Sequence, residues 1–355
     1  MFSVVKDYRN NKIVFEDINN IINKRKYWKK LNNKKILITG ACGSIARYFV
    51  YTLVELNLNH NFKIDIFANA RDYKKIEYFF GDYLQYDFFH YIIKDFSIGY
   101  DNEVQFDYII HAASNARPEL FYSKPVETIT SNVVATENLL KNNKNCSCFL
   151  FLSTGSVYGK FNDNKLTENV VGIIDFNKVI SSYSESKRVG ELLCQSYKHE
   201  YGTNVKIARI SHTFGPTLDL NVDERAFGQF FKNAILNKNI ELRSSGIVKR
   251  AFLYISDAIL AFFDIMLSDN DEIVYNVCGT NFISIYDFAS LIANYANVNL
   301  MLNPQDHIQD SNANLSIPPC NELLKKIGWK DSISIKEAIG LTFQGLKIEQ
   351  ERKNN

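Results

Sequence analysis

A tyrosine and a lysine four residues apart are the side chains of this sequence best suited to acid–base chemistry. They are Tyr183 and Lys187, in a segment whose pattern predicts a helix continuing through Glu191 and Leu193. Residues at this spacing share one helix face, so the Lys187 ammonium would lie beneath the Tyr183 phenol and stabilise its anion. A phenol with an ordinary pKa of about 10 would then serve as a base near neutral pH. In a chain this rich in lysine and tyrosine, the alternative is a chance surface pair.

An apolar run that ends in hydroxyl side chains favours the catalytic interpretation. The run Cys148–Ser153 predicts a buried strand, and Thr154, Gly155 and Ser156 follow it directly. Thr154 would therefore lie at a strand end, ahead of the helix that carries Tyr183.

A glycine-rich turn is the second feature with a chemical meaning. The first apolar run, Ile36–Thr39, leads into Gly40-Ala41-Cys42-Gly43-Ser44-Ile45-Ala46 and then into an apolar helical stretch that reaches Leu56. Glycines at such a strand-to-helix turn let the backbone approach a pyrophosphate, whose charge meets the free N–H groups of the helix. The pattern predicts a dinucleotide site.

The end of the second run bears on which dinucleotide binds. It reads Phe67-Ala68-Asn69-Ala70-Arg71-Asp72, without the acid that usually meets the ribose 2′-hydroxyl of NAD. Arg71 could meet the 2′-phosphate of NADP, whereas Asp72 or Asp65 could still reach the ribose. The choice between NAD and NADP stays open.

Short apolar runs are predicted to form the framework that positions these residues. They are apolar on both faces and separated by helical stretches, as buried parallel strands are. We predict an α/β fold, a doubly wound parallel (Rossmann) sheet with a smaller C-terminal substrate-binding lobe. The runs are Ile36–Thr39, Ile64–Ala68, Phe106–Ala112, Cys148–Ser153, Val205–Ile210 and Ile273–Val277.

The predicted organisation has three parts. Residues 1–34 form an N-terminal helical extension, residues 35–215 the NAD(P)-binding domain, to which a strand near 273–277 returns, and residues 216–345 mainly the substrate-binding lobe. Seven bases between Lys24 and Lys35 are interpreted as a solvated helix face rather than an anion or membrane patch, and no function is assigned to them.

Composition excludes several classes of protein. Of 355 residues, 46% are hydrophobic and 23% charged, which excludes collagen, coiled coil and wholesale disorder. A net charge of +2 is too small for a chain that mainly binds nucleic acid. We find no membrane span and no secretory leader at the start of the chain, and we expect a cytoplasmic protein. The six cysteines favour reduced thiols, and Cys146 and Cys148 lack further ligands for a metal site.

With these motifs in this order, the chain resembles the extended short-chain dehydrogenase/reductase family, in its nucleotide-sugar epimerase and dehydratase branch. The resemblance covers about residues 35–345. Besides the glycine turn, Ser153–Gly159 and the Tyr183–Lys187 pair, it rests on Asp95-Phe96, His111–Ser114, Asn132 with Thr136, Arg209–His212, Phe214-Gly215-Pro216, Arg250 and Tyr254–Asp257.

The resemblance implies roles for individual residues. Tyr183 would be the base, Lys187 would also hold the nicotinamide ribose, and Thr154 would hydrogen-bond the sugar hydroxyl that is oxidised. Arg250 would clamp the substrate diphosphate. The cofactor, NAD or NADP, would contact Gly40, Gly43, Ser44, Ile45, Arg71, Asp95, Phe96, Ala112, Ala113, Tyr183 and Lys187, and the nucleotide sugar would contact Ser114, Thr154, Ser156, His212, Arg225 and Arg250.

Two departures from the family pattern limit the activity. Where the family's dehydratases carry an Asp-Glu pair after the catalytic threonine, and its decarboxylases a glutamate at the second place, this chain has Gly155 and Ser156. Neither supplies the acid and base that dehydration needs. His212 replaces an asparagine of many relatives, and would either contact the substrate or be a buried, satisfied histidine.

We therefore expect an enzyme that epimerises a nucleoside-diphosphate sugar at C4 through a transient 4-keto sugar. One alternative is an NADPH-dependent 4-keto-sugar reductase. Another is a 4,6-dehydratase or decarboxylase, for which Glu185 or Asp223 could supply the missing acid. The last is a non-catalytic protein that senses the nicotinamide redox state. The resemblance also implies a homodimer built on the helices that carry Asn132–Leu140 and Tyr183–Leu193.

Overall fold

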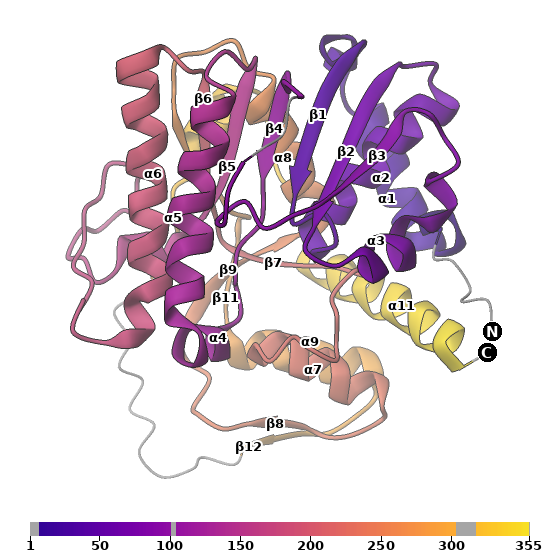
Figure 1. Cartoon of the computed structure of the whole chain (residues 1–355). Helices are drawn as coiled ribbons and strands as arrows, with labels where there is room; N and C mark the ends of the chain where they lie inside the picture. Colours follow the sequence, from indigo (N-terminus) through magenta and orange to yellow (C-terminus); the bar gives the residue numbers. More distant parts are fainter. Residues whose placement is uncertain (1–6, 101–103, 303–316, 355) are drawn as a thin grey trace.

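A seven-stranded parallel sheet forms the centre of the molecule (Figure 1). The computed structural model describes residues 7–100, 104–302 and 317–354. The expectation that the chain lacks a secretory leader rests mainly on residues 1–6, which lie outside these ranges. The strand order is β10-β6-β5-β4-β1-β2-β3, with bounds β1 Lys34–Thr39, β2 Ile64–Ala70, β3 Phe89–Ile93, β4 Tyr108–His111, β5 Cys148–Thr154, β6 Val205–Ile210 and β10 Val274–Val277.

The predicted α/β fold is confirmed, and each predicted run forms a strand of this sheet. The runs are apolar on both faces because both faces are covered. Along β1, Ile36 and Ile38 join the core on one side of the sheet, and Leu37 joins the core on the other. The sequence analysis missed β3, an edge strand that leaves Tyr91 and Ile93 exposed and therefore lacks a continuous buried run.

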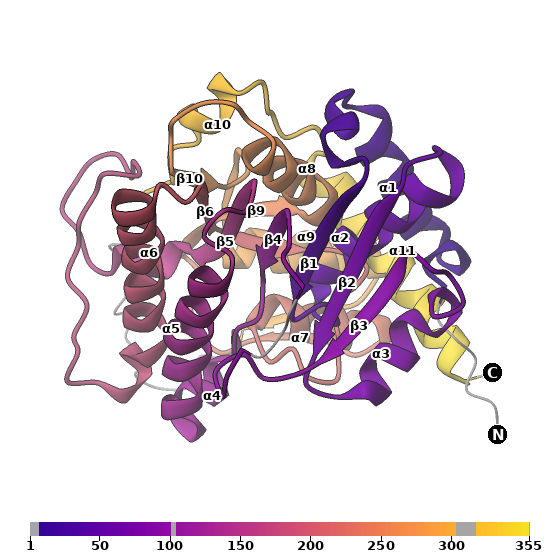
Figure 2. The ribbon, with the colours of Figure 1, turned by 45° about the horizontal axis from the view of Figure 1, so that its top comes forward.

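Helices cover both faces of the sheet (Figure 2). α5 (Pro125–Asn142) and α6 (Ser182–Tyr201) lie side by side on one face. On the other, α2 (Ser44–Asn59) packs beside α8 (Ile255–Met266), whose residues are all buried. The remaining short helices are α3 Tyr73–Phe80, α4 Pro118–Ser123, α10 Glu322–Lys326, η1 Tyr8–Asn10, η2 Tyr27–Leu31, η3 Gly81–Tyr83, η4 Gly155–Tyr158 and η5 Val179–Ser181.

A smaller group of elements lies at the end of the sheet where the parallel strands finish (Figure 1). Its aromatic core includes Phe252 and Phe288, whose rings stack with centroids 3.9 Å apart. It contains the three-stranded sheet β11-β9-β7 (Asn281–Ser284, Lys249–Tyr254, His212–Phe214), the pair β12-β8 (Leu300–Leu302, Ile240–Leu242), and the helices α7 Ala226–Ile235, α9 Ile285–Ala296 and α11 Ile335–Asn354. Ligands of doubly wound sheets bind at this end of the strands.

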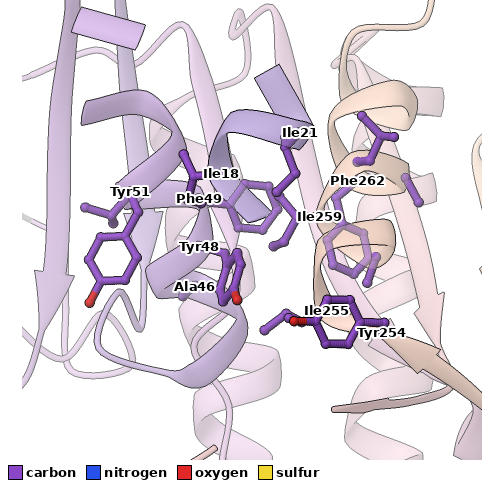
Figure 3. Packing of buried hydrophobic residues seen from close by; sticks show 14 of the residues in the cluster. Ile18, Ile21, Ala46, Tyr48, Phe49, Tyr51, Tyr254, Ile255, Ile259 and Phe262 are labelled. Carbon is purple, nitrogen blue, oxygen red and sulfur yellow. The ribbon is translucent and has the colours of Figure 1, made fainter. Parts of the chain in front are cut away.

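The N-terminal segment packs against the helices α2 and α8 that cover one face of the sheet (Figure 3). Helix α1 (Lys12–Asn23) lies against α2 and α8, and its Ile18 and Ile21 are buried beside side chains such as Phe49 and Phe262. At its centre, Asp17 accepts hydrogen bonds from two tyrosine hydroxyls, Tyr48 and Tyr254.

The basic residues after α1 are not simply a solvated face, as the sequence analysis interpreted them. Arg25 pairs with Asp264 at 2.6 Å, and Lys30 with Asp269 at 2.7 Å. These acids lie at the end of α8 or just beyond it, so the bases attach the N-terminal segment to the rest of the molecule.

None of the described helices has the length and apolarity that crossing a membrane requires. No cluster of histidine, cysteine and acidic side chains among the described residues could hold a metal ion. The six cysteines are unpaired thiols.

Candidate active site

The turn between β1 and α2 lets other groups approach its backbone closely. Gly40 has a φ of +62°, in the left-handed region that favours glycine. A Cβ atom there would lie 2.8 Å from the Cα of Ala113. α2 then begins at Ser44 with no side-chain cap at Gly43, which leaves its first N–H groups and the positive end of its dipole available to an anion. The turn fits the pyrophosphate site expected at Gly40, Gly43, Ser44 and Ile45.

A chain of hydrogen bonds through His111 fixes the backbone beside this turn. Thr39 Oγ1 accepts from the N–H groups of Ala112 and Ala113 at 3.1 and 3.0 Å. Its own proton therefore goes to His111 Nδ1, 2.8 Å away, and His111 Nε2–H donates to Thr136 Oγ1 at 3.1 Å. Burial lowers the pKa of His111 to about 3, so the ring is neutral. His111 thus holds Ala112 and Ala113, the residues expected to line the cofactor cleft.

Arg71 is engaged by carboxylates at the end of β2. Its Nη1 donates to Glu127 Oε1 of α5 at 2.6 Å and lies 3.6 Å from Asp95 Oδ2. The hydrogen bond with Arg71 lowers the pKa of Glu127. Arg71 is thus paired with two carboxylates although its side chain is 55% exposed, and its contact with a 2′-phosphate stays a prediction.

The loop after β3 carries the two residues expected beside the adenine. Asn69, at the end of β2, donates to the carbonyl groups of Ile92 and Lys94 and so fixes where this loop leaves the sheet. Phe96 is buried, and its carbonyl accepts from Asn138 of α5 at 2.8 Å. Asp95 accepts from the backbone and side chain of Ser97.

Tyr183 lies in the first turn of α6, with its ring against an aromatic neighbour. Phe121 of α4 stacks on it, with ring centroids 4.4 Å apart and 7° between the planes. Burial raises the pKa of the Tyr183 phenol, while a hydrogen bond with Thr154 and the charge of Arg225 act to lower it. The structure thus brings together Thr154 and Tyr183, as predicted.

The Lys187 ammonium is engaged by the strand that carries Thr154. It donates to the Leu152 carbonyl at 2.7 Å and lies 4.6 Å from the centre of the Phe151 ring. Burial lowers the pKa of Lys187 to about 7, opposed by the charge of Glu191. Its placement beneath the Tyr183 phenol, which the helix spacing predicts, stays a prediction.

A buried ion pair ties the strand that carries Thr154 to the helix that carries Tyr183. Glu191 of α6 accepts from Ser153 at 2.5 Å and from Arg209 of β6 at 2.6 Å. Arg209 Nη1 also donates to the Glu168 carbonyl at 2.8 Å. The pair therefore fixes β5, β6 and α6 relative to one another just below the site.

Positive charge gathers on the side of the site that faces the smaller lobe. Burial lowers the pKa of His212 to about 3, with smaller contributions from the charges of Arg250 and Arg225. Arg225 is oriented by Asp223, which accepts from its Nε and Nη2 at 2.8 and 2.6 Å. Two guanidinium groups beside a neutral imidazole suit the phosphate oxygens of a nucleoside diphosphate.

Ser156 lies beside Thr154, and two other side chains expected near the site carry buried polar atoms. Ser156 donates its backbone N–H to Thr154 Oγ1 at 3.2 Å, and its hydroxyl lies at the same distance. Ser114 Oγ and Asn132 Oδ1 are buried without a hydrogen-bond partner among the described residues. Buried polar atoms ordinarily have hydrogen-bond partners, so these two unpaired atoms fit a cleft in which a polar ligand supplies the missing hydrogen bonds.

Sequence reasoning missed Phe121, Glu127 and the Glu191–Arg209 pair. Phe121 lies in the short helix α4 and Glu127 in the first turn of α5, where no periodic pattern marks which side chains turn inward. The sequence did indicate Glu191, because it lies on the same helix face as Tyr183 and Lys187, one turn beyond Lys187 and two turns beyond Tyr183.

Comparisons with known proteins agree with this geometry. The model of a family described as the NAD dependent epimerase/dehydratase family matches residues 36–278. UDP-glucuronic acid decarboxylase 1 of Danio rerio is 27% identical over 335 residues, which cover 93% of this chain and 77% of that protein. dTDP-D-glucose 4,6-dehydratase of Homo sapiens is 26% identical over 332 residues, with coverages of 88% and 89%.

A solved structure shows the same fold. It is UDP-glucuronic acid 4-epimerase from Bacillus cereus, crystallised with UDP-glucuronic acid and NAD, with a TM-score of 0.72 at 20% identity. The match covers 89% of this chain and 99% of that one.

Proposed function

The chain belongs to the NAD-dependent epimerase/dehydratase family of nucleotide-sugar enzymes, and from that premise we propose that it is a 4-epimerase of a nucleoside-diphosphate sugar. The observation that carries the proposal is the chemistry around Tyr183. The Tyr183 phenol is hydrogen-bonded to the Thr154 hydroxyl, and Gly155 and Ser156, which follow Thr154, bring no carboxylate to it.

Dehydration and decarboxylation need more than this site offers. Gly155 and Ser156 stand where an acid pair or a glutamate would act. Of the candidates to replace them, Asp223 is held by Arg225, and Glu185 lies 3.6 Å from Arg188 on the next turn of α6. A single base with a hydroxyl neighbour suffices for reversible oxidation of a secondary alcohol.

The proposed reaction assigns a proton-handling task to this chain's own residues. Tyr183, as phenolate, takes the proton of the sugar C4 hydroxyl, which Thr154 holds by a hydrogen bond. A dinucleotide whose pyrophosphate is held at the Gly40 turn would supply reversible acceptance of the hydride from C4. After the ketose has rotated in the site, so that the hydride returns to its other face, Tyr183 returns the proton to the C4 oxygen. No net oxidation therefore occurs.

The remaining residues bind and orient. Arg225, Arg250 and His212 would hold the diphosphate, leaving the sugar free to rotate about it. Ser114 and Ser156 would contact sugar hydroxyls. Lys187 would move from the Leu152 carbonyl to the nicotinamide ribose.

The second candidate is a 4-keto-sugar reductase that consumes NADPH. Arg71 favours it, because a guanidinium suits a 2′-phosphate, but its pairing with Glu127 and Asp95 weakens that argument. We therefore rank it below epimerisation.

The test is incubation of the purified protein with a panel of UDP-, dTDP-, GDP- and CDP-sugars, with and without added NAD or NADPH, with products identified by NMR. Epimerisation predicts a C4 isomer without net change in cofactor. A 4-keto-6-deoxy product, carbon dioxide release or stoichiometric NADPH oxidation would each refute it. Tyr183→Phe serves as the control, and it should lose roughly 100-fold or more of the rate because the proton acceptor is gone.

A further inference from the structure

We propose that Phe121 is a positioning residue for Tyr183, holding the phenol ring flat against its own ring so that the hydroxyl is presented to Thr154. The role rests on the proposed function, because it matters only if Tyr183 is the base. It deepens that proposal by naming what orients the base in this chain.

The first observation is the stacked geometry of the two rings. Their centroids are 4.4 Å apart and their planes 7° from parallel, so Phe121 covers one face of the phenol. Phe121 is itself buried, with 9% of its surface exposed. A stacked neighbour of this kind restricts rotation of the tyrosine ring and keeps water from that face.

A second contact attaches Phe121 to the same helix turn. The Ser182 hydroxyl, one residue before Tyr183, donates to the Phe121 carbonyl at 3.3 Å. α4 also packs against η5, the short helix that leads into α6. Both the ring and the backbone of residue 121 are thus fixed relative to the start of α6.

The charges near the phenol act on its pKa rather than on the plane of its ring. Arg225 is the charged group that lowers the pKa of Tyr183, whereas Glu185 on α6, Glu119 on α4 and Glu127 on α5 do not shift it. The Lys187 ammonium is hydrogen-bonded to the Leu152 carbonyl. The stacked ring of Phe121 is the contact that we infer restrains the ring plane.

The first experiment reads the ring geometry without any substrate. Protein carrying ring-labelled ¹³C-tyrosine is compared by NMR with its Tyr183→Phe variant, which identifies the Tyr183 signals. In Phe121→Leu these signals should move toward the position of an unstacked tyrosine, because the ring current of Phe121 is lost. Tyr122→Leu, a change at an exposed neighbour on α4, should leave them in place.

The second experiment reads the consequence for the reaction, with the nucleotide sugar that the panel identifies. Phe121→Leu should lower kcat by roughly 3- to 10-fold, as for loss of one aromatic pair, with KM changed less than kcat. The rise of kcat with pH should also move to lower pH, because water reaching the ring removes part of the burial that raises the pKa of Tyr183. Phe121→Tyr, which keeps the flat ring, should restore both.

The outcomes separate this proposal from the proposed function. Unchanged Tyr183 signals and an unchanged pH profile in folded Phe121→Leu would overturn the positioning role, even if Tyr183→Phe is inactive. An active Tyr183→Phe enzyme would overturn the proposed function itself. If Phe121→Leu does not fold, Phe121→Met keeps the volume without the flat ring, and the same two readouts decide.

Discussion

His111 is fixed as a neutral ring with its proton on Nε2 by the direction of its hydrogen bonds. Because Thr39 Oγ1 already accepts two N–H groups, it must donate to Nδ1. With a pKa lowered to about 3, the ring should keep this tautomer throughout the stable pH range. We expect the ¹⁵N signals of His111 to be constant from about pH 5 to 8, where an ordinary histidine titrates near 6.5.

A His111 signal that titrates with a midpoint between about pH 6 and 7 would contradict the assigned network.

Glu127 is predicted to disfavour a 2′-phosphate beside Arg71. In Glu127→Gln the guanidinium loses a charged partner at 2.6 Å, so it is freer to meet a phosphate. Because the Arg71 side chain is 55% exposed, the effect is small, and the affinity for NADP relative to NAD should rise by roughly 2- to 5-fold. Calorimetric titration of cofactor-free protein measures both affinities.

Glu137→Gln, on the same helix and outside the Arg71 contact, is the matched control. An unchanged affinity ratio in Glu127→Gln would show that Arg71 does not face the ribose.

At the scale of residues, the sequence predicted which residues lie near one another better than it predicted what their side chains contact. The family resemblance implied that Thr154 and Tyr183 act together, and local pattern placed them at a strand end and in a helix. The hydrogen bond between the Lys187 ammonium and the Leu152 carbonyl was not predicted, because helix spacing gives only the face on which Lys187 lies. Glu127 reaches Arg71 across 56 positions of sequence, and no local pattern encodes such a contact.

At the scale of elements, α5 and α6 leave apolar side chains exposed on the outer face of the molecule. They are Val126 and Ile129 on α5, and Val189 and Leu192 on α6, with exposures from 41% to 71%. Exposed apolar groups gathered on neighbouring helices favour burial against another surface, and a second copy of the chain is the partner that the family resemblance implied.

We predict that the protein is a dimer through these helices, and that Ile129→Asp combined with Leu192→Asp yields a monomer. The reason is that burying two new carboxylates without partners disfavours association. Sedimentation at micromolar concentration measures the change. Ile247→Asp, at another exposed apolar position, should remain dimeric, and a parent protein that sediments as a monomer would contradict the prediction.

The elements also show why the central sheet was predictable and the smaller lobe less so. Buried parallel strands are apolar on both faces, as in β5, and so they stand out in a sequence. β8 and β12 are three-residue strands of mixed exposure, and β7 follows β6 after a single residue. Their pairing depends on contacts between distant segments rather than on a local pattern.

For the whole molecule, buried histidines and a buried aspartate make the free energy of unfolding depend on pH in opposite directions. Burial lowers the pKa values of His111 and His212 to about 3, so the unfolded chain binds protons between about pH 3 and 6.5 that the folded chain does not bind. Their contribution to stability is present above about pH 6.5 and is lost as the pH falls toward 3. Asp17 has the opposite effect on stability, because burial raises the pKa of its carboxyl to about 7.

Asp17 connects the N-terminal segment to the core, so its titration affects the stability of the whole fold. A carboxyl whose pKa is raised on folding contributes stability below its unfolded pKa of about 4, and that contribution is lost as the pH rises through 7. Asp17→Asn removes the buried charge while its carbonyl oxygen can still accept from Tyr48 and Tyr254. The variant should therefore gain stability relative to the parent as the pH rises from 6 to 8.

Thermal unfolding at pH 6 and pH 8 measures this difference. The fall in Tm of the parent between these values should shrink in Asp17→Asn by roughly 1–2 °C, which corresponds to about 1 kcal/mol for a chain of this length. Asp269→Asn, at a side chain that is 90% exposed, should leave the pH dependence as in the parent. Equal pH dependence in Asp17→Asn and the parent would mean that Asp17 is charged in the folded protein at pH 6, and that the two tyrosine hydroxyls offset its burial.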